Sequence, residues 1–278
     1  MWNGYGKARI AGLPIMRNKH YFASDFHLGL NARLDSRQRE LLIIKWLDEI
    51  KSEAASIYFV GDIWDFYFEY KKVVPKGFVR LLGKLAELRD AGIEMHFFKG
   101  NHDMWMFEYL DKELGIPIHD SELEVEIHGK RLMIGHGDGL GPGDHGYKFL
   151  KRIFRNRFAQ GLFRLLHPDL GIRIAEYWSL TSRNSSSERS EHYFEQDEWL
   201  IQYCRQVLKN KSIDYFIFGH RHLPIRYHFE NSTYINLGDW LEFQTYAVLD
   251  QGVLELKAFE NDKVRIYGNF DQVEQNQS

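Results

Sequence analysis

The chain has 278 residues, of which 44% are hydrophobic and 27% are charged, an ordinary composition for a globular protein. Its net charge of −3 gives no electrostatic case for a nucleic-acid partner, and we expect none. The single cysteine, Cys204, excludes an internal disulfide. No apolar run approaches the ~20 residues of a membrane span, and no apolar signal segment is evident near Met1. The sequence therefore predicts a globular, cytoplasmic protein.

The first third of the chain alternates between strand-like and helix-like patterns. Strands are predicted at residues 20–24, 57–60 and 93–98, because each is a short apolar run. One helix is predicted over 36–51 with Ser36 as its N-cap, and another over 75–92. This alternation predicts parallel strands with helices packed on the faces of the sheet.

In the rest of the chain, strand-like runs follow one another more closely, which is typical of antiparallel hairpins. Residues 123–127 and 131–134 predict a hairpin, and a helix over 190–208 precedes a strand at 213–218. We therefore predict one domain over residues 1–278, a mixed α/β four-layer sandwich with two mixed β-sheets inside and helices outside. Further strands are predicted at 225–229, 233–236, 246–249 and 253–258.

Residues 140–187, here called the insertion, do not fit this sandwich. No strand is evident between Gly139 and Ser187, and residues 147–166 have the pattern of one amphipathic helix. We predict a helical lid that folds over the edge of the sheets, although an ordinary surface helix with a solvated basic face would have the same pattern. One face is apolar (Tyr147, Leu150, Phe154, Phe158, Leu162, Leu165) and the other is basic (Lys148, Lys151, Arg152, Arg155, Arg157, Arg164).

Five short motifs stand where apolar, strand-like runs end. Each contains side chains that bind metals or phosphate, and the ends of neighbouring parallel strands meet at one edge of a sheet. We therefore expect the five motifs to lie close together. They are Ser24-Asp25-Phe26-His27, Gly61-Asp62-Ile63-Trp64-Asp65, Gly100-Asn101-His102-Asp103, Gly135-His136-Gly137-Asp138 and Gly219-His220-Arg221-His222.

The side chains of these motifs suit a dinuclear metal centre. Seven ligands are too many for one transition metal but suit two ions that share a carboxylate, and Asp62 is the candidate bridge. Two ions ~3.5–4 Å apart activate water and clamp the attacking and departing oxygens of a phosphate. Mn²⁺ is the first expectation, and Fe²⁺ or Zn²⁺ also fits mixed oxygen and nitrogen ligands. The seven are Asp25, His27, Asp62, Asn101, His136, His220 and His222.

Two further residues are candidates for catalysis. His102 follows the ligand Asn101, so it could stabilise charge on the transferring phosphoryl group or protonate the leaving oxygen. Asp65 could hold that imidazole in the required tautomer. The alternative for His102 is a buried histidine that only orients its loop.

The motifs D-x-H, G-D-x-x-D, G-N-H-[DE], G-H and G-H-x-H resemble those of the calcineurin-like metallophosphoesterase superfamily. The resemblance implies the sandwich fold with the site at the strand ends. It also implies which residues share an ion. One metal would be held by Asp25, His27, Asp62 and His222, and the other by Asp62, Asn101, His136 and His220.

Within the superfamily the chain is similar to the UDP-2,3-diacylglucosamine pyrophosphatases of lipid A biosynthesis. The similar features are Ser24–Leu28, His136–Asp138 with a helical insertion after it, Asp144-x-x-Tyr147 and Arg183-Asn184-Ser185. The chain departs from the best-known members in two places, with His102 where they have Arg and Asp65 where they tend to have Glu. The resemblance implies substrate contacts by Asn101, His102, Asp144, Ser185 and His220.

This resemblance implies an enzyme that hydrolyses the pyrophosphate bond of UDP-2,3-diacylglucosamine to UMP and 2,3-diacylglucosamine 1-phosphate by attack of a metal-activated hydroxide. Its partner would be a nucleotide-sugar lipid, reached by transient contact with the membrane surface, so the protein would be cytoplasmic or peripheral on the inner face. We make no prediction of oligomeric state. One alternative is a metallophosphatase or phosphodiesterase for a soluble nucleotide or phosphoprotein. Another is a metal-free scaffold, which the complete ligand set argues against.

Overall fold

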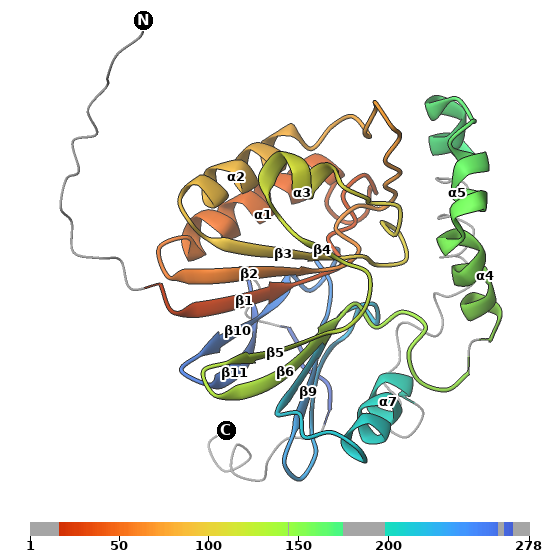
Figure 1. The fold of residues 1–278 in the computed structure, drawn as a ribbon. Helices are drawn as coiled ribbons and strands as arrows, with labels where there is room; N and C mark the ends of the chain where they lie inside the picture. Colours follow the sequence, from red (N-terminus) through yellow and green to blue (C-terminus); the bar gives the residue numbers. More distant parts are fainter. Residues whose placement is uncertain (1–16, 144, 175–197, 261–263, 269–278) are drawn as a thin grey trace, which may run out of the picture.

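Two β-sheets pack face to face at the centre of the molecule, with helices on their outer sides (Figure 1). The computed structural model describes residues 17–143, 145–174, 198–260 and 264–268. The first sheet has six strands in the order β11-β10-β1-β2-β3-β4, and the second has five in the order β5-β6-β7-β9-β8. The predicted mixed α/β sandwich is confirmed.

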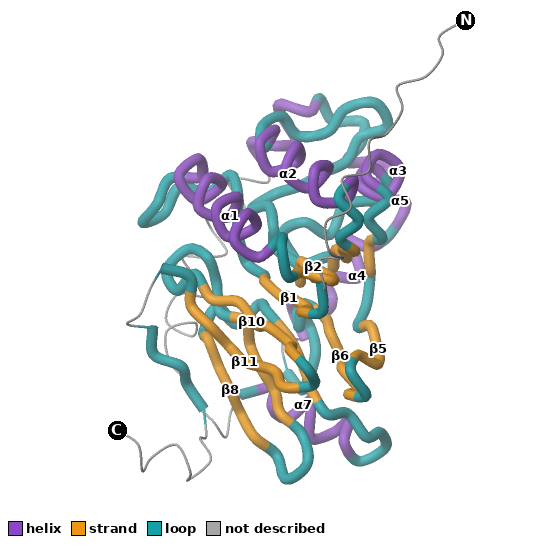
Figure 2. Tube along the Cα trace, turned by 90° about the vertical axis from the view of Figure 1, so that its left-hand side faces the viewer, coloured by secondary structure: helices purple, strands orange, loops and turns teal. Residues whose placement is uncertain are grey.

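The first sheet carries the parallel strands predicted for the first third of the chain. Strands β1 to β4 pair in parallel, whereas β10 and β11 complete the sheet in antiparallel pairing. Helices α1 and α2 lie together on the outer side of this sheet (Figure 2). The bounds are β1 Lys19–Ala23, α1 Ser36–Ile50, β2 Ala54–Val60, α2 Val79–Asp90, β3 Glu94–Phe98, α3 Tyr109–Leu114, β4 Ile118–His119, β10 Thr245–Asp250 and β11 Val253–Ala258.

The second sheet mixes one hairpin with a parallel centre. Strands β5 and β6 form the predicted hairpin, and β6, β7 and β9 run parallel. Helix α7 begins at Trp199, and residues 190–197 of the predicted helix lie outside the described residues. The bounds are β5 Leu123–Ile127, β6 Lys130–Gly135, α7 Trp199–Leu208, β7 Tyr215–Phe218, β8 Pro224–His228 and β9 Thr233–Leu237.

Three apolar layers hold the sandwich together. The layer between the two sheets contains the fully buried side chains of Phe22, Ile134 and Ile235. The layers under α1 and α2 and under α7 contain Trp46 and Phe216 respectively. Each fully buried side chain of this kind contributes about 1.5–3 kcal/mol to folding. The layers therefore fix the strands rigidly, and with them the loops that follow the strands.

The insertion differs from its prediction in one respect. Residues 147–166 do not form one helix, because α4 (His145–Arg155) ends before Asn156 and α5 (Arg157–Phe163) begins after it. The Asn156 backbone is extended, and its side chain accepts hydrogen bonds from the amides of Phe158 and Ala159 as an N-cap. Helices α4 and α5 stand as a rod beside the ends of the strands (Figure 1).

Smaller differences concern where the helices of the first sheet begin. Asp35, not Ser36, is the N-cap of α1, and its side chain forms a capping box with Gln38. Helix α2 begins at Val79, four residues after the predicted start at Pro75. The short elements α3 and β4 were not predicted from the pattern.

Candidate metal centre

The five motif loops meet at the carboxyl ends of the parallel strands of both sheets. Asp25 and His27 follow β1, Asp62 follows β2, and His136 follows β6. Among the described residues three groups form there, and in each group one ligand atom per residue lies within 4.8 Å of the others. The first group is Asp25, His27 and His222, and the second is Asp62, His136 and His220. The third, Asp65 and His102 with His27, shares a histidine with the first and contains the candidate catalytic residues.

The two groups share a compact, buried centre. His222 Nε2 lies 3.4 Å from Asp25 Oδ1, and His136 Nε2 lies 3.2 Å from Asp62 Oδ2. His27 Nε2 lies between the carboxylates, 3.7 Å from Asp25 Oδ1 and 3.8 Å from Asp62 Oδ2. The Oδ1 atom of Asn101 is 3.2 Å from His136 Nε2, so its amide belongs to the second group. The Oδ2 atom of Asp62 is therefore close to one histidine of each group.

Three histidines are held in one tautomer by an acceptor behind each ring. The Nδ1 atom of His136 donates to the carbonyl of Val60 over 2.9 Å. The Nδ1 atom of His27 donates to Asp65 Oδ1, and that of His222 donates to Asp239 Oδ2 over 3.1 Å. Because carbonyl and carboxylate oxygens only accept, Nδ1 carries a proton and Nε2 is the ring nitrogen directed to the centre. This is the usual support for metal-ligating histidines.

Two orphaned oxygens show that the centre fits cations. Asp25 Oδ1 and Asp62 Oδ2 are buried and accept no hydrogen bond among the described residues, which is costly unless a cation pairs with them. Burial lowers the pKa of His136, but the Asp62 carboxylate outweighs it and raises that pKa to about 10. The carboxylates therefore stabilise positive charge, and the oxygen and nitrogen donors suit Mn²⁺, Fe²⁺ or Zn²⁺.

Backbone strain is concentrated at the same residues. A positive φ is uncommon for residues other than glycine and costs of order 1–3 kcal/mol. Such strain persists where the surrounding structure fixes it, and it marks functional sites. Five residues of the two groups adopt it, namely Asp25 (φ 55°), His27 (45°), Asp62 (53°), His220 (67°) and His222 (58°).

The glycines that open the motifs allow this close approach. A Cβ atom on Gly61 would lie 2.5 Å from Nδ1 of His136, and one on Gly219 would lie 2.5 Å from Oγ of Ser24. Both positions sit where loops from the two sheets cross. Any larger residue there would therefore separate the ligand groups.

The two candidate catalytic residues, Asp65 and His102, lie together beside His27. The side chain of Asp65 contacts His27, with Oδ1 3.2 Å from its Nδ1, and lies 3.7 Å from His102 Nδ1. The ring of His102 instead donates from Nδ1 to the backbone carbonyl of Asp65 over 2.8 Å. The two rings stand edge to face with centroids 4.8 Å apart. The side chain of Asp65 thus supports a candidate metal ligand, and its backbone carbonyl orients His102.

The remaining predicted site residues fall into two sets. His220 is in the second group, its ring 5.2 Å from that of His136; burial and the neighbouring His136 lower its pKa to about 4. Asp144 and Ser185 lie outside the described residues.

Three supporting residues were missed by the sequence argument. Asp239 orients His222 and also caps the amides of Glu242 and Phe243. The carboxylate of Asp103 accepts from the amides of Ile63 and Gly100, so it ties the second motif to the third. The signal for Asp103 was its place as the last residue of the third motif, and the signal for Asp239 was its place directly after Gly238.

The third is Arg39, which is fully buried in α1. Its guanidinium donates to the carbonyls of Phe26, His27, Leu30 and Leu34 over 2.6–3.0 Å. One side chain therefore fixes the loop that presents His27.

The first residues of the insertion are attached to this centre through Asp138. Its Oδ2 accepts from the Tyr147 hydroxyl over 2.6 Å and pairs with Lys151 Nζ at 2.5 Å. Lys151 also donates to the Asp138 carbonyl. Since Asp138 is two residues beyond His136, α4 is anchored directly to a metal-ligand loop.

Comparisons with known proteins identify the family of this chain. Residues 20–224 match the calcineurin-like phosphoesterase family, which is most of the chain. The chain belongs to that family and is a hydrolase that acts on phosphate bonds. Among curated proteins it is 40% identical to a UDP-2,3-diacylglucosamine hydrolase of Porphyromonas gingivalis (strain ATCC BAA-308 / W83), over 88% of this chain and 99% of the relative. Enzymes of the same name from Proteus mirabilis (strain HI4320) and Haemophilus influenzae (strain ATCC 51907 / DSM 11121 / KW20 / Rd) are 29% and 26% identical, over 65% and 80% of this chain and 74% and 91% of theirs.

Proposed function

We propose that this protein hydrolyses the pyrophosphate bond of UDP-2,3-diacylglucosamine, giving UMP and 2,3-diacylglucosamine 1-phosphate. The observation that carries the proposal is the paired ligand groups beside a helical insertion, in a chain 40% identical over nearly the full length of a relative with that name. The centre supplies the phosphate chemistry, and the insertion is where a lipid would be selected.

Seven residues would hold two divalent ions, for which Mn²⁺ is the first candidate. Asp25, His27 and His222 would hold one ion together with the carboxylate of Asp62. Asn101, His136 and His220 would hold the other ion together with the same carboxylate. When bound, the ions activate water and neutralise charge on the phosphoryl group. The chain supplies the fixed geometry, through Arg39 and the acceptors behind the three histidines.

We assign His102 to contact the phosphoryl group that is transferred. Its Nδ1 is engaged by the carbonyl of Asp65, so Nε2 is the ring nitrogen that would meet a phosphate oxygen. A sugar phosphate is a good leaving group, so charge stabilisation is the larger demand and protonation the smaller. Asn101, His220, Asp144 and Ser185 are the further substrate contacts proposed from the resemblance.

Residues 140–187 are proposed to form the lid that receives the acyl chains. Phe154 and Phe163 pack on the ring of Trp105, whose indole nitrogen donates to the Phe154 carbonyl over 2.8 Å. Phe66 and Phe68 extend this cluster under α5. An aromatic wall of this kind beside the metal centre suits saturated chains, since each buried CH₂ contributes about 0.8 kcal/mol.

Transient contact with a membrane surface is proposed for the outer side of the same rod. Among the described residues no helix has the length and apolar character to cross a bilayer. The side chains of Phe149 and Phe158 are 65% and 75% exposed, and that of Leu165 is 82% exposed. Exposed apolar side chains gathered on adjoining helices are typical of interfacial binding. The substrate would then be drawn from the inner face of the cytoplasmic membrane.

A substrate panel with Mn²⁺ tests the proposal. It compares UDP-2,3-diacylglucosamine with an aryl phosphate, an aryl phosphodiester and a cyclic nucleotide. We expect the lipid nucleotide to have the highest kcat/KM and to yield UMP. A higher kcat/KM for any of the soluble compounds would contradict the proposal and favour a phosphatase or phosphodiesterase for soluble substrates.

A further inference from the structure

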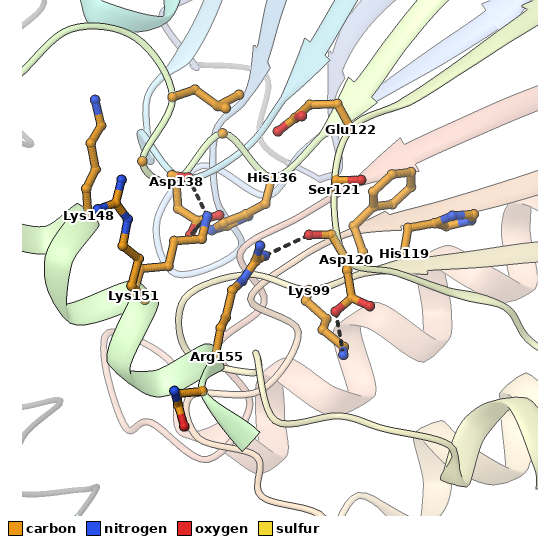
Figure 3. A pocket seen from close by; sticks show the side chains of 16 residues that line it. Lys99, His119, Asp120, Ser121, Glu122, His136, Asp138, Lys148, Lys151 and Arg155 are labelled. Carbon is orange, nitrogen blue, oxygen red and sulfur yellow. Dashed lines mark hydrogen bonds and ion pairs between the residues drawn. The ribbon is translucent and has the colours of Figure 1, made fainter. Parts of the chain in front are cut away.

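A cavity of about 510 Å³ lies beside the metal centre, and its lining includes His136 and residues of α4 but none of the aromatic cluster. Figure 3 shows it between α4, which contributes Lys148, Lys151 and Arg155, and the segment around Asp120 that joins β4 to β5. The ring of His136 lines its inner end. The cavity is therefore continuous with the second ligand group, and its volume is in the usual range for a small-molecule site.

The cavity wall is strongly basic. Five cationic side chains line it against three carboxylates, an excess of two positive charges with the histidines neutral. Such a concentration is unusual in a chain whose net charge is −3, and it favours a ligand with about two negative charges. The cations are Lys99, Lys148, Lys151, Arg152 and Arg155, and the carboxylates are those of Asp120, Glu122 and Asp138.

Most of these cations are already positioned by the protein. Lys99 pairs with Asp120 at 2.7 Å, and Arg155 donates to the Asp120 carbonyl at 2.7 Å. Lys148 donates to the carbonyl of Gly141 at 2.6 Å. Arg152 is exposed and has no hydrogen bond or ion pair to any other described residue. Arg152 is thus the side chain available to a ligand, in a pocket whose shape is fixed by its neighbours.

Helix α4 divides the approach to the metal centre into two unlike sides. On one side Phe154 meets Trp105 and the aromatic cluster. On the other side Lys151 and Arg155 face the basic cavity. When the pyrophosphate of the substrate is held at the centre, the nucleoside extends from it in one direction and the acylated sugar in the other. An acylated sugar suits the aromatic side, and a charged, hydrogen-bonding nucleotide suits the basic side.

We infer that the basic cavity is the binding site for the nucleoside monophosphate half of the substrate, with Arg152 contacting its phosphate or ribose. The inference rests on the proposed function for the identity of the nucleotide, UMP. The four α4 cations that line this cavity would then serve the negatively charged half of the substrate.

The test is calorimetric titration of the Mn²⁺-loaded protein with each product separately, UMP and micellar 2,3-diacylglucosamine 1-phosphate. Arg152→Glu should weaken UMP binding by roughly tenfold to a hundredfold, the usual range for a charge-assisted contact, and Arg152→Lys should restore most of it. Binding of the lipid product should change less than UMP binding. Arg131→Glu is the matched control, because Arg131 is an exposed residue of β6 at the end remote from His136.

The outcomes separate this inference from the proposed function. Unchanged UMP affinity in Arg152→Glu, or no UMP binding by the unaltered protein, would overturn the nucleotide site. A selective loss of lipid-product binding would reverse the assignment of the two sides and overturn it as well. If the unaltered protein binds UMP through Arg152 yet fails to cleave the UDP-linked lipid, the nucleotide site stands and the proposed substrate does not.

Discussion

The metal centre and the α4–α5 rod are neighbours built in opposite ways. The side chains of Asp25 and His27 are 0% exposed, and every ligand loop is tied to another by hydrogen bonds. In α4 and α5 no residue is buried, and Leu165 is 82% exposed. The centre is thus held by the core of the sandwich, whereas the rod is attached through Trp105, Asp138 and a few aromatic contacts.

Under the proposed function, this difference suits the two regions to separate tasks. Phosphate chemistry needs ligands fixed to fractions of an ångström, so it belongs on strand ends that the core makes rigid. Selection of a flexible, amphiphilic substrate needs apolar surface and charges that are accessible, so it belongs on an appended segment. Changes in the centre should therefore affect all substrates, and changes in the rod should affect only some.

The largest effect is expected for Asp62→Ala. Loss of the shared carboxylate should reduce bound metal to one ion or none and abolish hydrolysis of every substrate. Elemental analysis of the purified variant and assays with lipid and soluble substrates measure both. Asp111→Ala, which removes an exposed carboxylate of α3, is the control. Two tightly bound ions with near-normal turnover would show that Asp62 is not the bridge.

His102→Ala should lower turnover by roughly 10²–10⁴-fold, the usual contribution of a group that stabilises charge or transfers a proton. Metal content should be unchanged, because His102 is not one of the seven proposed ligands and its Nδ1 donates to the Asp65 carbonyl. Measuring the loss separately on pyrophosphate and phosphomonoester substrates shows whether His102 protonates the leaving group. A much larger loss on monoesters indicates protonation of the leaving group, and an unchanged rate on both would leave His102 with only a structural role.

Asp239→Asn should weaken the affinity of the ion held by Asp25, His27 and His222 by about 10–100-fold, as loss of a carboxylate behind a ligating histidine does. Asparagine keeps an oxygen for the amides of Glu242 and Phe243, so thermal stability should change little. Metal titration followed by calorimetry measures the affinity. Equal affinity in the variant and the unaltered protein would mean that the hydrogen bond to His222 does not support the ligand.

The smallest effect is expected for the double variant Phe158→Asp with Leu165→Asp. It removes two exposed apolar side chains and should lower binding to anionic phospholipid vesicles by at least about tenfold. Hydrolysis of an aryl phosphodiester in solution should stay within twofold. Sedimentation with vesicles is the measurement. Retained vesicle binding would place the membrane contact elsewhere on the molecule.

The sequence is informative about the centre because each ligand follows a strand. Asp25, Asp62 and His136 are placed by the pairing of the strands they follow, so their meeting could be predicted from the order of the elements. Contacts made across the fold could not. Arg39 lies on a helix whose pattern is typical of a surface helix, and only the tertiary structure places it beneath the His27 loop. The contact between Asp65 and His27 likewise depends on the turn after Asp62.

The insertion was predicted less well for a related reason. The spacing of its apolar residues suggested one helix. Asn156, however, favours the N-cap position over a helix interior, so one helix ends before it and a second begins after it. Beyond Asn156 the side chains of Phe158 and Leu165 are exposed to solvent, although their spacing in the sequence places them on the same predicted helix face as Phe154. Periodicity identifies amphipathic segments, and it does not say which apolar side chains meet the core.

Deletion of residues 147–180 tests the separation of the two regions most directly. No proposed metal ligand lies in that segment, so the variant should still bind two ions and cleave a soluble aryl phosphodiester. The ratio of kcat/KM for UDP-2,3-diacylglucosamine to that for the phosphodiester is the measured quantity, with metal content and thermal melting as controls. We predict that this ratio collapses. An equal loss on both substrates in a folded variant with two bound ions would contradict the account.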